Sequence, residues 1–168
     1  MTSEGVAYRS ATPDDAGAVI YVHHAAVKAI GNDVYSDAVL LAWSPPPEEQ
    51  RRRRIAELIT QDSTVCIVAE CDAEIVGFGL ALPAEGWLRA LYIHPDHSGI
   101  GTGKQLLHFV ELQCQSSGIA TLQVNASHNA EGFYRRCGYE LIGPTIQRLT
   151  ETISIPASHM MKRFPASG

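Results

Sequence analysis

Residues 91–107 form the sequence Leu91-Tyr92-Ile93-His94-Pro95-Asp96-His97-Ser98-Gly99-Ile100-Gly101-Thr102-Gly103-Lys104-Gln105-Leu106-Leu107. The first part is typical of a β-strand, and the last part begins a helix. Glycines at every second position separate the two. Glycine lets the backbone pass close to a ligand, and the unpaired N–H groups at a helix start attract an anion. The segment therefore predicts a phosphate-binding turn between a strand and a helix.

Two familiar nucleotide-binding loops do not fit this turn. A P-loop requires glycine at position 98 and serine or threonine after Lys104, where this chain has Ser98 and Gln105. A dinucleotide fingerprint that starts at Gly99 requires glycine or alanine in place of Lys104. Both interpretations fail on spacing. On this segment alone, a glycine-rich turn without a ligand remains the alternative.

Length and composition indicate one globular domain, predicted to span residues 1–168. The 168 residues are 45% hydrophobic and 18% charged, which is enough apolar material for a sizeable core. The net charge of -5 gives no overall positive field, so neither nucleic acid nor a membrane is an expected partner. An anionic ligand must be held by a local device such as the glycine-rich turn.

No targeting or metal-binding pattern stands out. The segment Met1 to Ser10 lacks the apolar run of a signal peptide, and no stretch reaches the roughly 18 apolar residues of a membrane span, so we expect a cytoplasmic protein. The cysteines form no Cys-x-x-Cys pair and are expected to be reduced core thiols. Cys137 lies near a motif described below, but a nucleophilic role is disfavoured. The run from His94 to His97 is typical of a turn and has no third ligand, so no metal is expected.

The hydrophobic pattern predicts alternating strands and helices. A capping box at Thr12-Pro13-Asp14-Asp15 begins the first helix. The Arg51 to Arg54 run is expected to be a solvated helix face, with Glu48 and Glu49 four residues before Arg52 and Arg53. No clear pattern covers 143–158. Strands are predicted over 8–12, 64–70, 74–82, 87–94, 120–125, 138–142 and 159–164, and helices over 13–30, 36–43, from 48 onward, 101–117 and 129–137.

The second motif is Asn125-Ala126-Ser127-His128-Asn129-Ala130-Glu131-Gly132-Phe133-Tyr134-Arg135-Arg136-Cys137-Gly138-Tyr139. Together with residues 91–107 it resembles the signature of the GCN5-related N-acetyltransferase (GNAT) superfamily, in the same order and at a similar separation. The resemblance covers most of the chain from Tyr8 to Ile142 and is sharpest over 91–139. It implies the acyl-CoA N-acyltransferase fold. The expected class is therefore α/β (α+β), with a mixed, mostly antiparallel sheet of about six or seven strands flanked by helices.

The resemblance implies acetyl-CoA as co-substrate. Its pyrophosphate would lie on the turn amides, and its pantetheine arm would run along the strand that ends at Ile93. The parting of this strand from residues 120–125 would form the acyl slot, with the Ile93 amide facing the thioester carbonyl. Two residues depart from the signature: Ser98 replaces arginine or glutamine, which Lys104 would offset, and Ser127 replaces asparagine. The predicted cofactor site comprises Leu91, Tyr92, Ile93, Ser98, Gly99, Ile100, Gly101, Thr102, Gly103, Lys104, Asn125, Asn129, Phe133 and Tyr134.

Tyr134 matches the family tyrosine that protonates the departing CoA thiolate. The residues alone favour a core aromatic at this position. The helix that carries Tyr134 also has Ser127 and Asn129 before it, and these either cap it or contact the cofactor. Glu85 is the first candidate for the base that accepts the amine proton, and the other candidates are Glu70, His94 and His97.

The acceptor is expected to be an amine on a small molecule or a peptide, and an acidic pocket would suit a cationic amine. His23 is expected in the core. The resemblance also suggests a homodimer. The alternative function is a CoA-binding sensor or interaction module that has lost acetyl transfer. The predicted acceptor pocket comprises His24, Tyr35, Trp43, Trp87 and Arg89.

Overall fold

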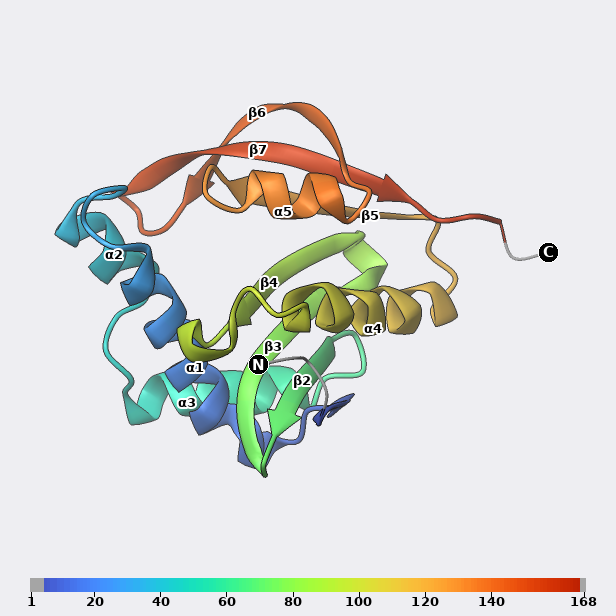
Figure 1. Ribbon diagram of the computed structural model, residues 1–168, viewed down its shortest axis with the longest axis horizontal. Helices are drawn as coiled ribbons and strands as arrows, with labels where there is room; N and C mark the ends of the chain where they lie inside the picture. The colour runs from blue at the N-terminus through green and yellow to red at the C-terminus, as the bar shows by residue number, and fades with distance from the viewer. Residues whose placement is uncertain (1–4, 167–168) are drawn as a thin grey trace.

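The computed structural model describes residues 5–166, which form a seven-stranded sheet with helices on both faces (Figure 1). The strand order is β1-β2-β3-β4-β5-β7-β6. This confirms the predicted fold class. The strands are β1 (Val6–Ser10), β2 (Val65–Cys71), β3 (Glu74–Leu82), β4 (Trp87–Ile93), β5 (Thr121–Ser127), β6 (Glu140–Arg148) and β7 (Ser154–Arg163). The helices are α1 (Ala16–Ile30), α2 (Asp37–Trp43), α3 (Glu49–Ile59), α4 (Thr102–Ser116) and α5 (Glu131–Arg136), with short 3₁₀ turns η1 (Pro13–Asp15), η2 (Pro83–Glu85) and η3 (Pro95–His97).

The sheet opens between β4 and β5. In the described part of the chain these two strands share one ladder pair, Trp87 with Gln123, and they run parallel there, whereas the other neighbours are antiparallel. Figure 1 shows the two strands meeting at the right of the view and separating toward α2 at the left. The predicted parting of the strands is therefore confirmed.

A β-bulge bends β4 just after this pair. Leu80 faces Ala90 and Ala81 faces Leu88, so Arg89 has no partner on β3. A bulge of this kind inserts one extra residue, increases the local twist and redirects a side chain. The bulge lies where β4 leaves β5.

Each face of the sheet has its own core. On one face α4 packs on the strands through residues such as Leu106, Leu107 and Val110, which are at most 1% exposed. A side chain on Gly79 would come within 2.7 Å of Val110 Cγ2, so this glycine lets α4 approach the sheet closely. On the other face α1 packs through Val22 and its neighbours against Phe78.

The last two strands are longer than predicted. Strand β6 continues to Arg148, and β7 begins at Ser154 rather than at residue 159. The hydrophobic pattern does not show their full length, because β6 is an edge strand whose side chains alternate between half-buried and exposed. Gly143 and Pro144 also argue against a strand, but an edge position tolerates them.

The N-terminal capping box forms as predicted. The backbone N–H of Thr12 donates to Asp15 Oδ2 at 2.7 Å, and Arg9 Nη1 lies 2.8 Å from the same oxygen. The hydrogen bond from Arg9 is the main reason why the pKa of Asp15 is lowered.

The arginine run of α3 divides into two parts. Arg53 pairs with Glu49 as expected, whereas Arg52 pairs with Glu49 rather than with Glu48. Both arginines lie on the exposed side, as a solvated helix face requires. Arg51 departs from the prediction, because it turns inward and its Nη2 lies 3.0 Å from His23 Nδ1. His23 itself is half-buried and packs edge-on against Tyr92, with ring centroids 4.5 Å apart, so it lies at the edge of the core rather than fully within it.

Candidate active site

A cleft of about 230 Å³ lies where β4 and β5 separate. The whole of β4 and the end of β5 form its walls, and residues from α1, α2, α5, β6 and β7 complete the lining. It is lined by Ala26, Ile30, Trp43, Trp87, Leu88, Arg89, Ala90, Leu91, Tyr92, Ile93, Val124, Asn125, Ala126, Ser127, Asn129, Ala130, Tyr134, Gln147 and Ile155.

The open edge of β4 offers backbone groups to the cleft. The N–H of His94 donates to Val76 O on β3 at 2.7 Å. Successive residues of a strand direct their N–H groups to opposite edges, so the Ile93 N–H faces away from β3 and toward β5. The same alternation directs the Leu91 N–H toward the cleft. These groups can pair with an extended ligand that lies along β4.

The glycine-rich turn connects the end of β4 to α4 through η3. Gly101 is the N-cap residue of α4 and has a φ of 90°, in the left-handed region that favours glycine. The first intrahelical bond shown for this end runs from Gln105 N to Gly101 O at 3.1 Å, so the N–H groups of Thr102, Gly103 and Lys104 precede the helical ladder. Such groups form an anion site at the end of the helix dipole.

Two of the predicted turn residues have local structural roles, and a third is free. The Ser98 hydroxyl donates to Pro95 O at 2.9 Å, so this side chain stabilises the turn. A side chain on Gly103 would lie 3.3 Å from Phe133 Cε2. Gly103 therefore lets α4 approach α5, and Phe133 packs behind the turn rather than lining the cleft. Lys104 is exposed and free to reach a ligand phosphate.

Tyr134 lines the cleft from α5 and is only 6% exposed. It packs edge-on against Tyr139, with ring centroids 5.4 Å apart. Burial raises the pKa of Tyr134, and the nearby Tyr92 and Cys137 raise it further. The phenol therefore stays protonated at neutral pH, which a proton donor requires.

Asn125, Ser127 and Asn129 lie on the β5 side of the cleft. The N-cap position of α5 is Ala130, whose N–H donates to the backbone oxygen of Ser127 at 2.9 Å. Among the described residues, no side chain caps this helix. The capping interpretation of Ser127 and Asn129 is therefore wrong, and both residues line the cleft instead.

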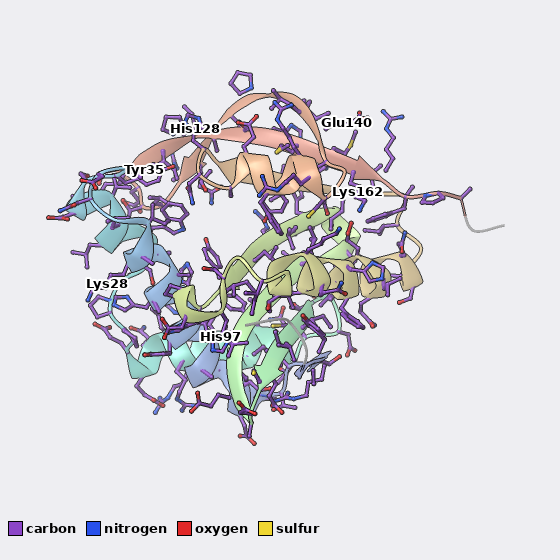
Figure 2. The ribbon with its side chains drawn as sticks, viewed as in Figure 1. Lys28, Tyr35, His97, His128, Glu140 and Lys162 are labelled. Atoms are coloured by element: carbon purple, nitrogen blue, oxygen red, sulfur yellow. The ribbon has the colours of Figure 1, made fainter. Side chains whose placement is uncertain are left out.

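The predicted acceptor residues divide between the cleft and its surroundings. Trp43, Trp87 and Arg89 line the cleft. Tyr35 packs edge-on against Trp43, with ring centroids 5.5 Å apart, and Figure 2 shows it near His128 at the open end. His24 is not brought into the cleft. Its Nδ1 lies 3.2 Å from Ser44 O, in a hollow between α1 and α2.

The charge of the cleft differs from expectation. Among residues 5–166 no aspartate, glutamate or histidine lines it, and Arg89 is its one charged side chain. The expectation of an acidic pocket is therefore wrong. Glu85 lies in η2 outside the lining, and its Oε2 is 3.3 Å from Arg89 Nη2.

The other candidate bases also lie outside the lining of the cleft. Glu70 pairs with Arg9 at 2.9 Å. His94 Nδ1 accepts a hydrogen bond from the Asp96 N–H at 3.2 Å within the turn, and His97 follows in η3 (Figure 2).

Sequence analysis missed a partly buried charge cluster formed by Glu111, Tyr139 and Lys162. Lys162 Nζ lies 2.9 Å from a carboxylate oxygen of Glu111, and Tyr139 donates to the same carboxylate at 3.4 Å. Lys162 also donates to Cys137 O at 2.9 Å. The cluster joins α4, β7 and the end of α5, and so supports the helix that carries Tyr134. Its only signal in the sequence is Glu111 beside Val110 on the apolar face of α4.

The four cysteines are free, as predicted. Burial raises the pKa of Cys137, with a further contribution from Glu111, which does not suit a nucleophile. Residues 5–166 contain no group of three or more histidine, cysteine, aspartate or glutamate side chains placed to hold a metal ion. None of the helices in the same range combines the length and apolar composition needed to cross a membrane.

The comparison with known families agrees with this architecture. Residues 37–159 match the acetyltransferase (GNAT) domain. The chain belongs to the GNAT acetyltransferase family. Among curated proteins, the uncharacterized N-acetyltransferase ycf52 of Pyropia yezoensis is 29% identical to this GNAT chain over 73 residues, which are 42% of each protein. The match therefore spans less than half of that relative.

Solved structures share the GNAT fold over nearly their whole length. A GCN5-related N-acetyltransferase from Rhodopseudomonas palustris has a TM-score of 0.85 at 24% identity and covers 98% of this chain and 99% of its own. The PaiA N-acetyltransferase from Thermoplasma acidophilum, solved with coenzyme A, has a TM-score of 0.77 at 18% identity, with 95% and 99% covered. The protein yncA from Salmonella typhimurium, solved with acetyl-CoA, has a TM-score of 0.71 at 16% identity, with 98% and 96% covered.

Proposed function

We propose that this GNAT protein transfers the acetyl group of acetyl-CoA directly to a primary amine while both substrates are bound. The observation that carries the proposal is the separation of β4 from β5 beside a helix N-terminus with free N–H groups. The cleft offers an unpaired strand edge to an amide-containing chain, and the turn offers donors to a phosphate. The two relatives solved with coenzyme A and acetyl-CoA support this choice of co-substrate.

The residues of the cleft suit the long cofactor. The pantetheine amides would pair with backbone groups of Leu91 and Ile93, as an added strand does. On the facing wall of the same cleft, Asn125 is half-buried and Asn129 is exposed, and both side chains are polar. The pyrophosphate would lie on the N–H groups that open α4, with Lys104 as the nearby cation. Because the Ser98 hydroxyl bonds to Pro95, residue 98 would contribute its backbone rather than its side chain.

The transfer itself needs three contributions from this chain. The Ile93 N–H would donate to the thioester oxygen, where negative charge develops as the amine nitrogen bonds to the acetyl carbon. The carbon–sulfur bond then breaks, and Tyr134 would give its proton to the sulfur. Positioning of the two substrates in one cleft supplies much of the remaining rate enhancement.

The amine must lose a proton, and the cleft has no acidic or histidine lining among the described residues. We therefore propose that the ammonium proton leaves to water. Glu85 remains a candidate base only through a water molecule, because it lies outside the cleft and pairs with Arg89.

Isothermal titration with acetyl-CoA tests the proposal without knowledge of the acceptor. The Gly101→Glu variant puts bulk and negative charge at the left-handed N-cap of α4. Gly118→Glu is a matched control, because Gly118 also has a positive φ, of 87°, but lies beyond the other end of α4 in open space. We expect micromolar binding to the wild type and to Gly118→Glu, and none to a folded Gly101→Glu. If folded wild-type protein does not bind millimolar acetyl-CoA, the proposal is overturned. Binding without turnover on any amine would favour the sensor instead.

A further inference from the structure

The cleft carries positive rather than negative charge, although the whole chain has a net charge of -5. Within the described residues, its one charged lining side chain is Arg89. An amine with several positive charges would find a cation here and no carboxylate to pair with. A ligand that carries a carboxylate would find a guanidinium, the side chain best shaped to bind it.

Arg89 is available for such a ligand. It occupies the bulge of β4, so its side chain is set apart from the ladder at the point where the strands separate. Its side chain is 53% exposed, and Nη2 makes one contact of 3.3 Å with Glu85 Oε2. A guanidinium has five N–H donors, so several remain free. An exposed ion pair of this kind is weak, and an incoming carboxylate can replace it.

The surroundings of Arg89 are apolar and aromatic. Its guanidinium carbon lies 6.0 Å from the ring centroid of Trp87, and Trp43, Ile30 and Ile155 also line the cleft. A hydrocarbon or aromatic group would be buried against these walls. The cleft of about 230 Å³, part of which the acyl end of the cofactor would fill, suits a small acceptor.

We infer that the acceptor is a small amino acid with an apolar or aromatic side chain. This inference rests on the proposed acetyl transfer. The carboxylate would bind Arg89, the side chain would pack against Trp43 and Trp87, and the amino group would face the thioester. The ammonium first loses one proton to water, and its nitrogen bonds to the acetyl carbon. The carbon–sulfur bond breaks and Tyr134 gives a proton to the sulfur. The nitrogen, which is positively charged once it has bonded to the acetyl carbon, loses its second proton to water, and Tyr134 takes up a proton from solvent. The products are the N-acetyl amino acid and free CoA.

Fluorescence of the protein's own tryptophans provides a direct test, because Trp43 and Trp87 are its two tryptophans and both line the cleft. The probes are L-phenylalanine, L-leucine and L-methionine, each beside its decarboxylated amine and its amide, with spermidine as a polycation. They are titrated into protein saturated with CoA. We expect at least one amino acid to bind about tenfold more tightly, or better, than both its decarboxylated amine and its amide. A tenfold difference in Kd corresponds to about 1.4 kcal/mol.

Two variants test whether Arg89 is the residue that gives the preference for a carboxylate. Arg89→Gln removes the charge and should abolish the preference, while acetyl-CoA binding measured by titration calorimetry persists. Arg148→Gln, an exposed arginine on the edge strand β6, is the matched control and should keep the preference. If acetyl-CoA binds but the decarboxylated amines or spermidine bind as tightly as the amino acids, the inference is overturned and the proposed function stands. If acetyl-CoA does not bind, the proposed function itself has failed.

Discussion

The indole Nε1 of Trp43 donates a hydrogen bond of 2.9 Å to the hydroxyl of Tyr92 and so joins α2 to the cleft strand β4. Burial raises the pKa of Tyr92 to about 12, so this hydroxyl is protonated at neutral pH. The bond holds an acceptor-side tryptophan against the strand that would carry the cofactor. The two halves of the cleft are therefore coupled through one contact between side chains.

Tyr92→Phe removes this contact while keeping the ring. We expect a loss of about 1 kcal/mol in the free energy of unfolding, because the Trp43 N–H loses its acceptor. The KM for the acceptor should rise more than the KM for acetyl-CoA, since Trp43 of α2 belongs to the proposed acceptor pocket. Urea unfolding and steady-state kinetics measure the two effects. Tyr21→Phe is the control, because Tyr21 is 60% exposed. Equal changes in both KM values would contradict this role.

Tyr134→Phe tests the proton donor. The ring fills the same space, so acetyl-CoA binding should persist, while kcat falls by roughly 10²- to 10⁴-fold because the thiolate departs without a proton. Tyr139→Phe is a matched control: Tyr139 is also buried, but its hydroxyl donates to Glu111 rather than lining the cleft. This control should lose stability and keep the kcat of the folded protein. An unchanged kcat in Tyr134→Phe would make Tyr134 a packing residue.

His23 should make the protein less stable in mild acid. Burial lowers the pKa of His23 to about 4, with further contributions from Arg51 and His24. A histidine in the unfolded chain titrates near about 6.5, so below that pH the unfolded state takes up a proton that the folded state refuses. The stabilising contribution is thus present above about pH 6.5 and is lost as the pH falls toward 4.

Urea unfolding at two pH values measures this effect. Between pH 7 and pH 5 we expect His23 to contribute a loss of about 2 kcal/mol in the free energy of unfolding. His23→Gln should remove most of that dependence, whereas replacement of the exposed His108 by glutamine should leave it in place. If His23→Gln keeps the wild-type pH dependence, the loss arises elsewhere.

The parts of the fold that follow local rules were predictable from the sequence. The start of α4 could be placed to within a residue because the glycines before it and the apolar spacing after it are both local signals. Strand β6 was underestimated because an edge strand buries little and tolerates Gly143 and Pro144. The predicted β7 was too short for the same reason, because the first half of β7 pairs with the part of β6 that the sequence pattern did not reveal.

The site was predictable only in part. The turn and Tyr134 belong to contiguous motifs, so sequence alone could locate them. The bulge at Arg89 depends on the register of β4 against β3, which is a long-range property. The sign of the charge in the cleft depends on which side chains the sheet gathers there. The net charge of the chain gave the wrong sign for the cleft, because the carboxylates of residues 5–166 lie outside its lining.

Glu85→Gln separates two roles for the carboxylate that contacts Arg89. If Glu85 only competes for the guanidinium, its removal should tighten amino acid binding by about 1.4-fold to fivefold, the range expected for an exposed ion pair of about 0.2–1 kcal/mol. The kcat should then stay within about twofold of the wild type, since water takes the amine proton. If Glu85 is the base, kcat should instead fall by about 10²-fold or more. Fluorescence titration and rates of CoA release measure both, with the exposed Glu140→Gln as control. A large fall in kcat without tighter binding would identify Glu85 as the base acting through water, and would contradict transfer of the proton directly to bulk solvent.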